Sequence, residues 1–406
     1  MNGPPPGVAS PGKPALAYMP LIVLLTALAA LGMLSTNIYL PALPVIGQAL
    51  QADAGQVRLT LTVYLAVFAV CQLVAGPLSD RHGRRPVLLF GLPLFFAATL
   101  VCAMSTSIEM LILGRALQAV GACAASVVGR AMARDLFDGP ALGRALGLIM
   151  TGVAVAPGFG PLLGGLLQEG FGWRAPFYAV AAFGILTLAI VLRALGETRP
   201  PAAGPVRLAG AFASYGSLLG SSAFLLPALA TSCALGALFA FFAGAPGLFI
   251  AAYGQSPTEF GLTSSATVFA VFAGGFSAPR LMRRFGAMAA VRFGFLVLAG
   301  GGALLLALTV SAPGLWPAIG ATFVFLYGIG IVNPLTVAAA LQPFPQRAGA
   351  ASALIGALQM AGATTGAALV NLLPLPGLQP MPAAMLATAL LGLLCMLVRP
   401  RVAQLA

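Results

Sequence analysis

Charged side chains are what this sequence has least of. They make up 7% of its 406 residues, whereas 60% of the residues are hydrophobic; a soluble domain carries about 25% charged residues. A chain this apolar would not stay in solution, so the composition excludes an ordinary soluble domain and indicates a polytopic membrane protein. All eight acids lie at or near the ends of apolar runs: Asp53, Asp80, Glu109, Asp135, Asp138, Glu169, Glu197 and Glu259.

Residues that carry metal or hydrolytic chemistry are also scarce. The one histidine, His82, excludes an H-E-x-x-H metal site and disfavours a histidine-based triad. No G-x-x-x-x-G-K-[ST] phosphate loop occurs, which argues against an ATP-driven pump. We expect no metal, no cofactor and no enzymatic activity, although the serines leave a membrane-embedded enzyme as an alternative.

Cysteines are few and stand singly in apolar runs, at Cys71, Cys102, Cys123, Cys233 and Cys395. None of them forms a C-x-x-C pair, which is the spacing typical of a metal or redox site. We therefore expect reduced cysteines that serve in packing.

Long apolar runs fill the rest of the chain. A membrane span needs about 20 apolar residues, and its backbone groups must be satisfied within the segment, as in a helix. We predict an all-α protein with twelve transmembrane helices. The predicted spans are 19–40, 57–78, 87–106, 109–131, 142–167, 174–195, 221–249, 260–279, 288–310, 314–340, 348–371 and 379–398.

The predicted spans fall into two groups of six. A polar segment at 196–219 separates a first six-helix bundle, 18–195, from a second one, 220–398. We expect a disordered tail at 1–17, which is rich in Pro and Gly, and a short tail at 399–406.

The positive charges predict the orientation in the membrane. If both termini are cytoplasmic, sixteen of the twenty Lys and Arg residues fall on that side, as the positive-inside rule requires. The exceptions are Arg58, Arg115, Arg130 and Arg174. Topology therefore explains the net charge of +12, and we expect no nucleic-acid partner.

The densest charge cluster is residues 76–86, GPLSDRHGRRP. Charge at mid-span costs roughly 2.5–3.5 kcal/mol per residue, so we predict a tight, water-exposed turn between the second and third spans. The arginines recur at 280–284 with a constant offset of 199 and with Pro279 in the place of Asp80. Both copies join the second and third spans of their half, which indicates a parallel repeat.

Five stretches resemble sequences of the major facilitator superfamily. Residues 76–86 look like its loop 2–3 signature, 113–121 (LGRALQAVG) its fourth-span R-x-x-Q-x-x-G motif, and 152–165 (GVAVAPGFGPLLGG) the G-P-x-x-G-G signature of exporters that run as antiporters. Residues 36–44 and 241–248 are similar to the bicyclomycin and chloramphenicol resistance (Bcr/CflA) branch. The resemblance implies twelve helices around a central cavity and drug export driven by the proton gradient.

One position departs from that branch, whose members usually carry an aspartate where this chain has Asn37. Asparagine cannot titrate, so a role of this carboxylate in proton coupling is in doubt. Either Glu109 or another acid at a span end titrates, or the protein is an uncoupled facilitator.

A cytoplasmic gate is predicted around the 76–86 cluster, in which Asp80 pairs with Arg84 or with an arginine near Asp135. The alternative is that the cluster is only a solvated turn, with no gating role, whose arginines follow the positive-inside rule. The predicted gate residues are Gly76, Asp80, Arg81, Gly83, Arg84, Arg85 and Asp135.

A substrate cavity is predicted from isolated polar and aromatic residues within the spans. The predicted cavity residues are Asn37, Tyr39, Tyr64, Arg115, Gln118, Phe239, Phe242, Tyr327, Asn333 and Gln359. A buried membrane arginine such as Arg115 marks a functional site by default; the alternative is that it snorkels to the interface. For the other residues the alternative is plain packing or contact with lipid.

The span-five signature also allows two interpretations. Its glycines and prolines are Gly152, Pro157, Gly160, Pro161, Gly164 and Gly165. Glycines at this spacing let helices approach closely, which pure packing explains. The resemblance implies instead that the bend and the close contact limit leakage during antiport.

The resemblance, together with the topology, implies a bacterial inner-membrane exporter of small amphipathic drugs, either amphenicols or bicyclomycin-like compounds. We expect a monomer with a small-molecule substrate, the proton as coupling ion and the lipid bilayer as surroundings. The alternatives are an uncoupled facilitator, an exporter of a small metabolite, and a non-transporting sensor or scaffold on a transporter fold.

Overall fold

The computed structural model describes residues 18–199, 208–311 and 314–398. The predicted tails at 1–17 and 399–406, together with residues 200–207 of the predicted linker, lie outside the described residues.

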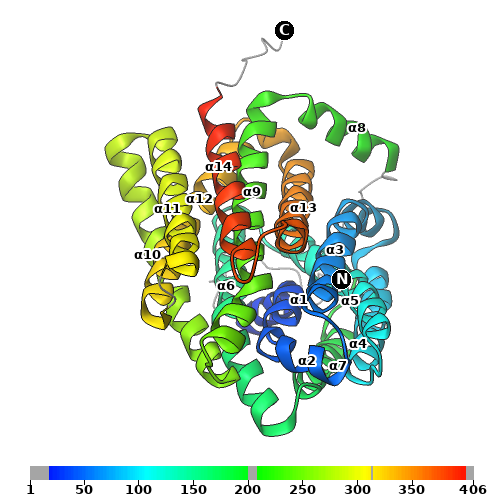
Figure 1. Cartoon of the computed structure of the whole chain (residues 1–406). Helices are drawn as coiled ribbons and strands as arrows, with labels where there is room; N and C mark the ends of the chain where they lie inside the picture. Colours follow the sequence, from blue (N-terminus) through cyan, green and yellow to red (C-terminus); the bar gives the residue numbers. More distant parts are fainter. Residues whose placement is uncertain (1–17, 200–207, 312–313, 399–406) are drawn as a thin grey trace, which may run out of the picture.

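Every regular element in this described part is helical (Figure 1). The elements are α1 Met19–Asn37, η2 Leu40–Ala42, α2 Leu43–Ala49, α3 Ala54–His82, α4 Arg84–Ala103, α5 Ile108–Leu136, α6 Gly139–Phe171, α7 Ala175–Ala194, α8 Leu208–Leu219, α9 Ser222–Pro246, η3 Gly247–Ala252, α10 Pro257–Phe285, α11 Ala287–Ser311, α12 Leu315–Leu341, η4 Pro345–Arg347, α13 Ala348–Leu372 and α14 Pro380–Leu397.

Twelve helices of the described chain are long and apolar enough to cross a membrane, which confirms the predicted number. The first runs over Met19–Ala49, nine residues beyond the predicted end of span one. This span is not one continuous helix: α1 ends at Asn37, and η2 and α2 extend the span with Pro41 and Pro44 in their first turns. Proline is tolerated there, since its missing N–H would have no partner in a first turn.

The first three spans of the two halves repeat with an offset of 203 residues. α3 and α10 both have 29 residues and both begin with a capping box, Asp53 with Gln56 and Ser256 with Glu259. Each is followed by a glycine of positive φ, Gly83 at 99° in the first half and its counterpart at 84° in the second.

The offset of 199 that the arginine pattern suggested is therefore wrong by four residues, about one helical turn. The pattern matched by residue type and not by structural position. Arg283 and Arg284 lie in the last turn of α10 and are exposed, whereas Arg84 begins α4 and is buried. In the structural register, the counterpart of Asp80 is Arg283 and not Pro279.

Residues 76–86 join the second and third spans tightly, as predicted, and Arg81, His82 and Pro86 are exposed, but the segment is helical almost throughout and only partly open to water. α3 continues to His82 and α4 begins at Arg84, so that Gly83 alone separates the two helices. Ser79, Gly83 and Arg84 are buried. The charges are tolerated because they bind one another, as described below.

The predicted polar linker contains an additional helix, α8. Its Tyr215 and Leu218 are buried against Ala340, Leu354 and other apolar residues of the second half. Burial, followed by the charge of Asp80, raises the pKa of Tyr215, so α8 also lies near the end of α3.

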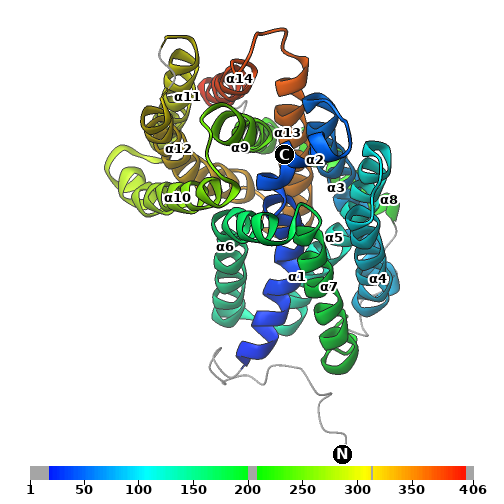
Figure 2. The same ribbon diagram turned by 60° about the horizontal axis from the view of Figure 1, so that its bottom comes forward.

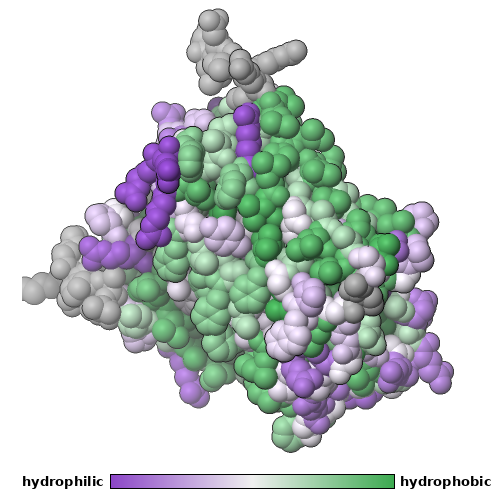
Figure 3. Space-filling view, turned by 60° about the vertical axis from the view of Figure 1, so that its left-hand side comes forward, coloured by the Kyte–Doolittle hydropathy of each residue, from purple (hydrophilic) through white to green (hydrophobic). Residues whose placement is uncertain are grey.

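The halves meet along two helix pairs, α6 with α10 and α3 with α13. Figure 2 shows α6 beside α10, with α1, α4, α5 and α7 on one side and α9, α11, α12 and α14 on the other. Hydrophobic side chains cover much of the face in Figure 3, and hydrophilic ones gather toward its edges. This distribution suits a protein whose middle lies in lipid.

Polar bonds also join the halves at the end of the molecule where α6 ends and α10 begins. The carboxylate of Glu169 accepts hydrogen bonds from the Thr258 backbone N–H at 2.9 Å and from its hydroxyl at 2.6 Å. Arg58 Nε donates to Asn371 Oδ1, and Asn371 Nδ2 donates to the Gly55 carbonyl at 3.3 Å. These bonds are exposed, and they connect α6 with α10 and α3 with α13.

Candidate functional site

A buried arginine forms the centre of a polar cluster in the first half. Arg115 of α5 is 0% exposed, and its Cζ lies 4.4 Å from the ring centroid of Tyr39 and 4.2 Å from that of Tyr64. Its Nη1 donates to the Ser35 carbonyl at 3.1 Å and to Gln118 Oε1 at 2.5 Å. The guanidinium therefore lies between two tyrosine rings inside the bundle and does not snorkel to the interface.

Arg115 has no acidic partner in the described part of the chain, where both ion pairs are made by Arg84. Its Nε and Nη2 are buried and have no hydrogen-bond partner. The two aromatic faces supply part of the missing stabilisation, because a cation is attracted to the face of a ring. The result is a fixed positive charge with two unused donors.

A hydrogen-bond chain holds Gln118 in place beneath this charge. Its Nε2 donates to Thr99 Oγ1 at 2.8 Å, and the Thr99 hydroxyl donates to the Phe95 carbonyl at 2.6 Å. This fixes Gln118 Oε1 toward Arg115. Sequence reasoning missed Thr99, because a single threonine in an apolar run carries no signal of its partner.

Asn37, at the end of α1, is also 0% exposed. Its Nδ2 donates to the Met33 carbonyl at 2.7 Å, while Oδ1 is buried without a partner. The residue packs against α6, where a Cβ on Gly160 would lie 2.9 Å from the Cβ of Asn37. Asn37 thus joins α1 to the span-five signature.

A second polar cluster lies in the other half and is uncharged. Asn333 Oδ1 accepts from the Thr231 hydroxyl at 3.0 Å and from Gln359 Nε2 at 3.2 Å. Gln359 Nε2 also donates to Thr231 Oγ1 at 3.0 Å. The structure thus brings together two predicted cavity residues, and it adds Thr231, which the sequence did not single out.

Two of the predicted aromatic residues, both in α9, pack against each other. The rings of Phe239 and Phe242 are 5.4 Å apart and nearly perpendicular, an edge-to-face arrangement that is favourable for aromatic pairs. Tyr327 of α12 is partly buried and makes no hydrogen bond with either polar cluster. Of the predicted aromatic cavity residues in this half, Phe239 and Phe242 therefore pack together, and Tyr327 lies apart from both polar clusters.

Most of the predicted cavity residues are enclosed in this conformation. Six of them are at most 1% exposed: Asn37, Tyr39, Tyr64, Arg115, Gln118 and Phe239. A substrate reaches them only after the helices move apart, so their contact with substrate stays a prediction.

The predicted gate residues form a bridged ion pair at the junction of α3 and α4. Arg84 Nη1 donates to Asp80 Oδ1 and, at 2.7 Å, to the hydroxyl of Ser79, while its Nε donates to Asp135 Oδ2 at 2.8 Å. The side chains of Arg84 and Asp135 are 10% and 12% exposed, against 39% for Asp80. One arginine thus ties the ends of α3, α4 and α5 together.

Glu197, which follows α7, completes this gate cluster and was not among the predicted residues. Its carboxylate accepts the backbone N–H groups of Arg84 at 2.9 Å, Arg85 at 3.1 Å and Arg199 at 2.9 Å. It thereby caps the first turn of α4, whose preceding residue, Gly83, has no side chain to do so. Burial alone would raise the pKa of Glu197, but these backbone donors together hold the pKa below its ordinary value.

The remaining predicted gate residues play smaller parts. Arg81 offers its backbone carbonyl to Arg199 Nη1 at 3.0 Å. The side-chain Nε of Arg85 is buried without a partner. A Cβ on Gly76 would meet Val127 at an ordinary contact distance of 4.0 Å, so close packing does not require glycine there.

The glycines of the span-five signature press α6 against α1. A Cβ on Gly164 would lie 1.7 Å from the carbonyl oxygen of Ile38, and a Cβ on Gly152 would lie 2.2 Å from Cγ2 of Thr26. At Gly164 the obstacle is backbone, so a side chain there requires movement of a helix, whereas at Gly152 the Thr26 side chain would have to shift. Close packing is therefore sufficient to explain why the motif has glycines where α6 contacts α1.

The same helix also touches the other half. A Cβ on Gly165 would lie 2.3 Å from the Pro257 carbonyl oxygen of α10. Pro157 and Pro161 are inside α6, which nevertheless runs from Gly139 to Phe171. The signature thus lies where one helix of the first half meets both its own neighbour and the second half.

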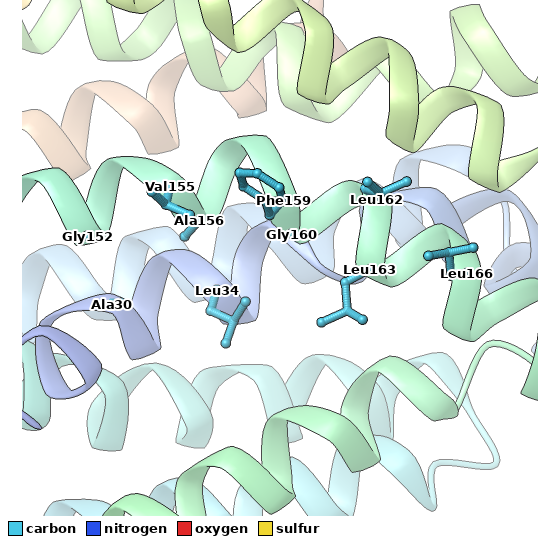
Figure 4. Close-up of a pocket in the computed structure, with 10 residues that line it drawn as sticks. All are labelled: Ala30, Leu34, Gly152, Val155, Ala156, Phe159, Gly160, Leu162, Leu163 and Leu166. Carbon is cyan, nitrogen blue, oxygen red and sulfur yellow. The ribbon is translucent and has the colours of Figure 1, made fainter. Parts of the chain in front are cut away.

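An apolar groove of about 450 Å³ runs along the flank of α6 and α1. Figure 4 shows Leu34 of α1 and Val155, Phe159, Leu163 and Leu166 of α6 along it. Gly152 and Gly160 are the two predicted site residues that line it. The groove is separate from both polar clusters.

Twelve membrane-length helices in two repeated halves, with polar clusters inside both, define a membrane transporter of the secondary type. The family model of the Major Facilitator Superfamily matches residues 25–367, and the chain belongs to this family. Its relatives are transporters and not enzymes, and the helices and bacterial relatives together indicate a multi-pass inner-membrane protein.

Several curated proteins are similar over nearly their whole length. Multidrug resistance protein D of Escherichia coli (strain K12) is 33% identical over 93% of this chain and 95% of its own. A chloramphenicol resistance protein of Pseudomonas aeruginosa is 34% identical over 92% of this chain and 90% of its own.

Solved structures share the fold at low sequence identity. An inward-facing bacterial homologue of the human lysosomal transporter Spinster has a TM-score of 0.73 at 16% identity, covering 95% of this chain and 96% of its own. A D-xylose–proton symporter has the same TM-score at 15% identity, covering 92% of this chain and 97% of its own.

Proposed function

We propose that the protein exports small amphipathic drugs by alternating access between its two six-helix halves, as a member of the Bcr/CflA branch. The observation that carries this proposal is the unpaired positive charge of Arg115, buried between Tyr39 and Tyr64. Relatives at 33–34% identity that are named for multidrug and chloramphenicol resistance support it.

Both termini are placed in the cytoplasm under this proposal, and the protein acts as a monomer. The gate cluster of Asp80, Arg84, Asp135 and Glu197 then lies at the cytoplasmic end. The water-exposed bonds of Glu169 and Arg58 lie at the outer end and join the two halves there.

The substrate binds between the clusters of Arg115 and Asn333 once the helices separate. A drug pocket needs mostly apolar walls with a few polar groups that fix orientation, and Phe239 and Phe242 supply such walls. Because Arg115 repels cations and no carboxylate offsets it, neutral and anionic drugs are favoured. Amphenicols fit this class.

A transport panel tests the substrate class. Efflux of an anionic, a neutral and a cationic amphipath of similar size is measured from a host that lacks its own exporters. Wild type is expected to export the neutral and anionic compounds faster than the cationic one. In Arg115→Gln the efflux rate of the cation is expected to come closer to the rates of the other two. Robust efflux of cations alone contradicts the proposal.

Arg115→Lys is the matched control, because it keeps the charge and loses the planar guanidinium that lies between the rings of Tyr39 and Tyr64. If charge decides selectivity, Arg115→Lys retains the preference of wild type against cations even where its rate falls. If Arg115→Lys and Arg115→Gln behave alike, the effect of Arg115 is packing and not charge.

Proton-coupled antiport is the proposed driving mode, with the coupling group at a span end. Asn37 does not titrate, and none of the eight acids, all within the described chain, hydrogen-bonds to the Arg115 or Asn333 cluster. Two modes of transport are therefore open: the proton is coupled through a distant acid such as Glu109, or the protein is an uncoupled facilitator.

Proton release on addition of substrate separates these two modes. The purified protein is mixed with a substrate whose binding has been confirmed, and the pH of a weakly buffered solution is followed. Release that disappears in Glu109→Gln supports coupling through that acid. The absence of release at every pH where substrate binds supports the uncoupled facilitator.

A further inference from the structure

Two cysteines that are far apart in the sequence lie together in the second half. Cys233 is in α9 and Cys395 is in α14, and the two thiols are close enough to interact with each other. α9 and α14 pack side by side, as Figures 1 and 2 both show. Both cysteines are free thiols, and nothing in the sequence pairs them.

The contact depends on a glycine one turn before Cys395. A Cβ on Gly392 would lie 3.2 Å from the Cβ of Cys233 and 2.3 Å from the ring of Phe295. The missing side chain lets the two helices approach closely at this level. Positions three apart on a helix share a face, so the backbone at Gly392 and the thiol of Cys395 both face Cys233.

The other three cysteines do not form such a pair. Cys102 and Cys123 are fully buried, whereas Cys233 and Cys395 are partly exposed. Cys71 is partly exposed and lies near enough to Cys123 for an electrostatic interaction, with no hydrogen bond between them. Cys71 and Cys123 thus serve as a built-in comparison pair.

We propose that Cys233 and Cys395 form a dithiol site for trivalent arsenic. Both thiols are free. A disulfide would have to bring the two sulfurs to about 2.05 Å, whereas an arsenic atom bonded to both holds them farther apart and so requires less movement of the helices. With phenylarsine oxide, both thiols lose their protons to the oxide oxygen, two S–As bonds form, and one water leaves. Arsenic stays trivalent, so no oxidant or reductant takes part.

The site lies directly behind the polar cluster of the second half. Thr231, which binds Asn333 and Gln359, is two residues from Cys233 on the same helix. An arsenic bridge ties this part of α9 to the last turn of α14. The site requires a neutral, membrane-permeant arsenical, because both thiols are within the span helices.

Intact-protein mass spectrometry of the full chain in lipid nanodiscs tests the proposal with phenylarsine oxide as the probe. Wild type is expected to gain one phenylarsenic group, which a small-molecule dithiol removes. Cys233→Ser and Cys395→Ser are each expected to gain none. A variant with Ala at positions 71, 102 and 123 retains the pair and is expected to gain one.

Each outcome decides the proposal. If wild type or the triple alanine variant gains no arsenic, or if either single serine variant still gains one, the site is not this pair. Equal thermal unfolding of all four proteins before treatment shows that a lost adduct reflects the missing thiol and not misfolding. The readout does not involve transport and stands apart from the proposed drug export.

Discussion

The carboxylate of Glu197 accepts the backbone N–H of Arg84 at 2.9 Å across 113 residues of sequence. The contact joins the segment after α7 to the first turn of α4. It satisfies N–H groups that no local side chain reaches, since Gly83 precedes them. The charge cluster at the end of α3 is thus held in place by a carboxylate from a distant segment.

Replacing Glu197 is expected to change how stability depends on pH. Its pKa is depressed in the folded protein, so its contribution is fully present above its ordinary pKa and fades as the pH falls through the depressed value. Glu197→Gln is expected to flatten the decline of the unfolding temperature between about pH 6 and pH 3. Asp138→Asn is the control, because Asp138 makes no side-chain capping bond; an unchanged slope in Glu197→Gln contradicts the prediction.

Gly83→Ala is expected to destabilise the protein more than Gly286→Ala. Both glycines have backbone angles that other residues avoid, φ 99° and 84° with ψ 158°, which costs about 1–3 kcal/mol for alanine. A Cβ on Gly83 would also lie 2.5 Å from Glu197 Oε2, while a Cβ on Gly286 meets nothing within 4 Å. Thermal unfolding of the two variants measures the difference, and equal losses would rule out the contribution of the Glu197 contact.

Arg84→Lys is expected to weaken the gate cluster although it keeps the charge. A lysine has one point charge, whereas Arg84 uses separate nitrogens for Asp80 and Asp135. Breaking a buried pair costs 3–5 kcal/mol, and about 2 kcal/mol is expected here because Asp80 is partly exposed. Chemical unfolding checks the value against Arg283→Lys, which changes an exposed arginine; similar losses in both contradict the prediction.

Gly164→Ala is expected to separate α6 from α1. The new Cβ would lie 1.7 Å from the Ile38 carbonyl oxygen, so the helices must move. Gly147→Ala is the control in the same helix, because a Cβ there meets nothing within 4 Å, and alanine gains up to about 1 kcal/mol of helix propensity. Expression and unfolding temperature should fall for the first and hold or rise for the second; wild-type stability of Gly164→Ala would show that the helices can yield.

The number and approximate places of the spans were predictable because each needs only a run of apolar residues. Their ends were less so. The charged residues 76–86 suggested a loop, whereas α3 and α4 leave out Gly83 alone. Local composition does not reveal that Arg84 finds two carboxylates and stays helical.

The repeat was predictable in kind but not in register. Matching arginines gave an offset of 199, whereas the capping boxes at Asp53 and Ser256 follow the structural offset of 203. A cap is fixed to a helix start by its hydrogen bonds, while an exposed arginine can shift by a turn at little cost. The S/D-x-x-E/Q pattern was therefore the better signal.

The candidate site was predictable where a polar residue stands out in an apolar run, as Arg115 and Asn333 do. Their partners were not, because Thr231 and Thr99 bind across helices at separations that one sequence does not encode. Glu197 offered a weak signal, since it is the one acid between positions 170 and 258. No feature of the sequence indicates that Cys233 and Cys395 interact.

The bonds of Glu169 to Thr258 and of Arg58 to Asn371 are exposed to water. Each bond that breaks is replaced by one to water, so its net contribution is only about 1 kcal/mol. These bonds therefore help to align the two halves, but they contribute little to the free energy that holds the halves together. At this end we therefore expect the close packing of α6 on α10, where a Cβ on Gly165 would lie 2.3 Å from the Pro257 carbonyl oxygen, to hold the two halves together more than the polar bonds do.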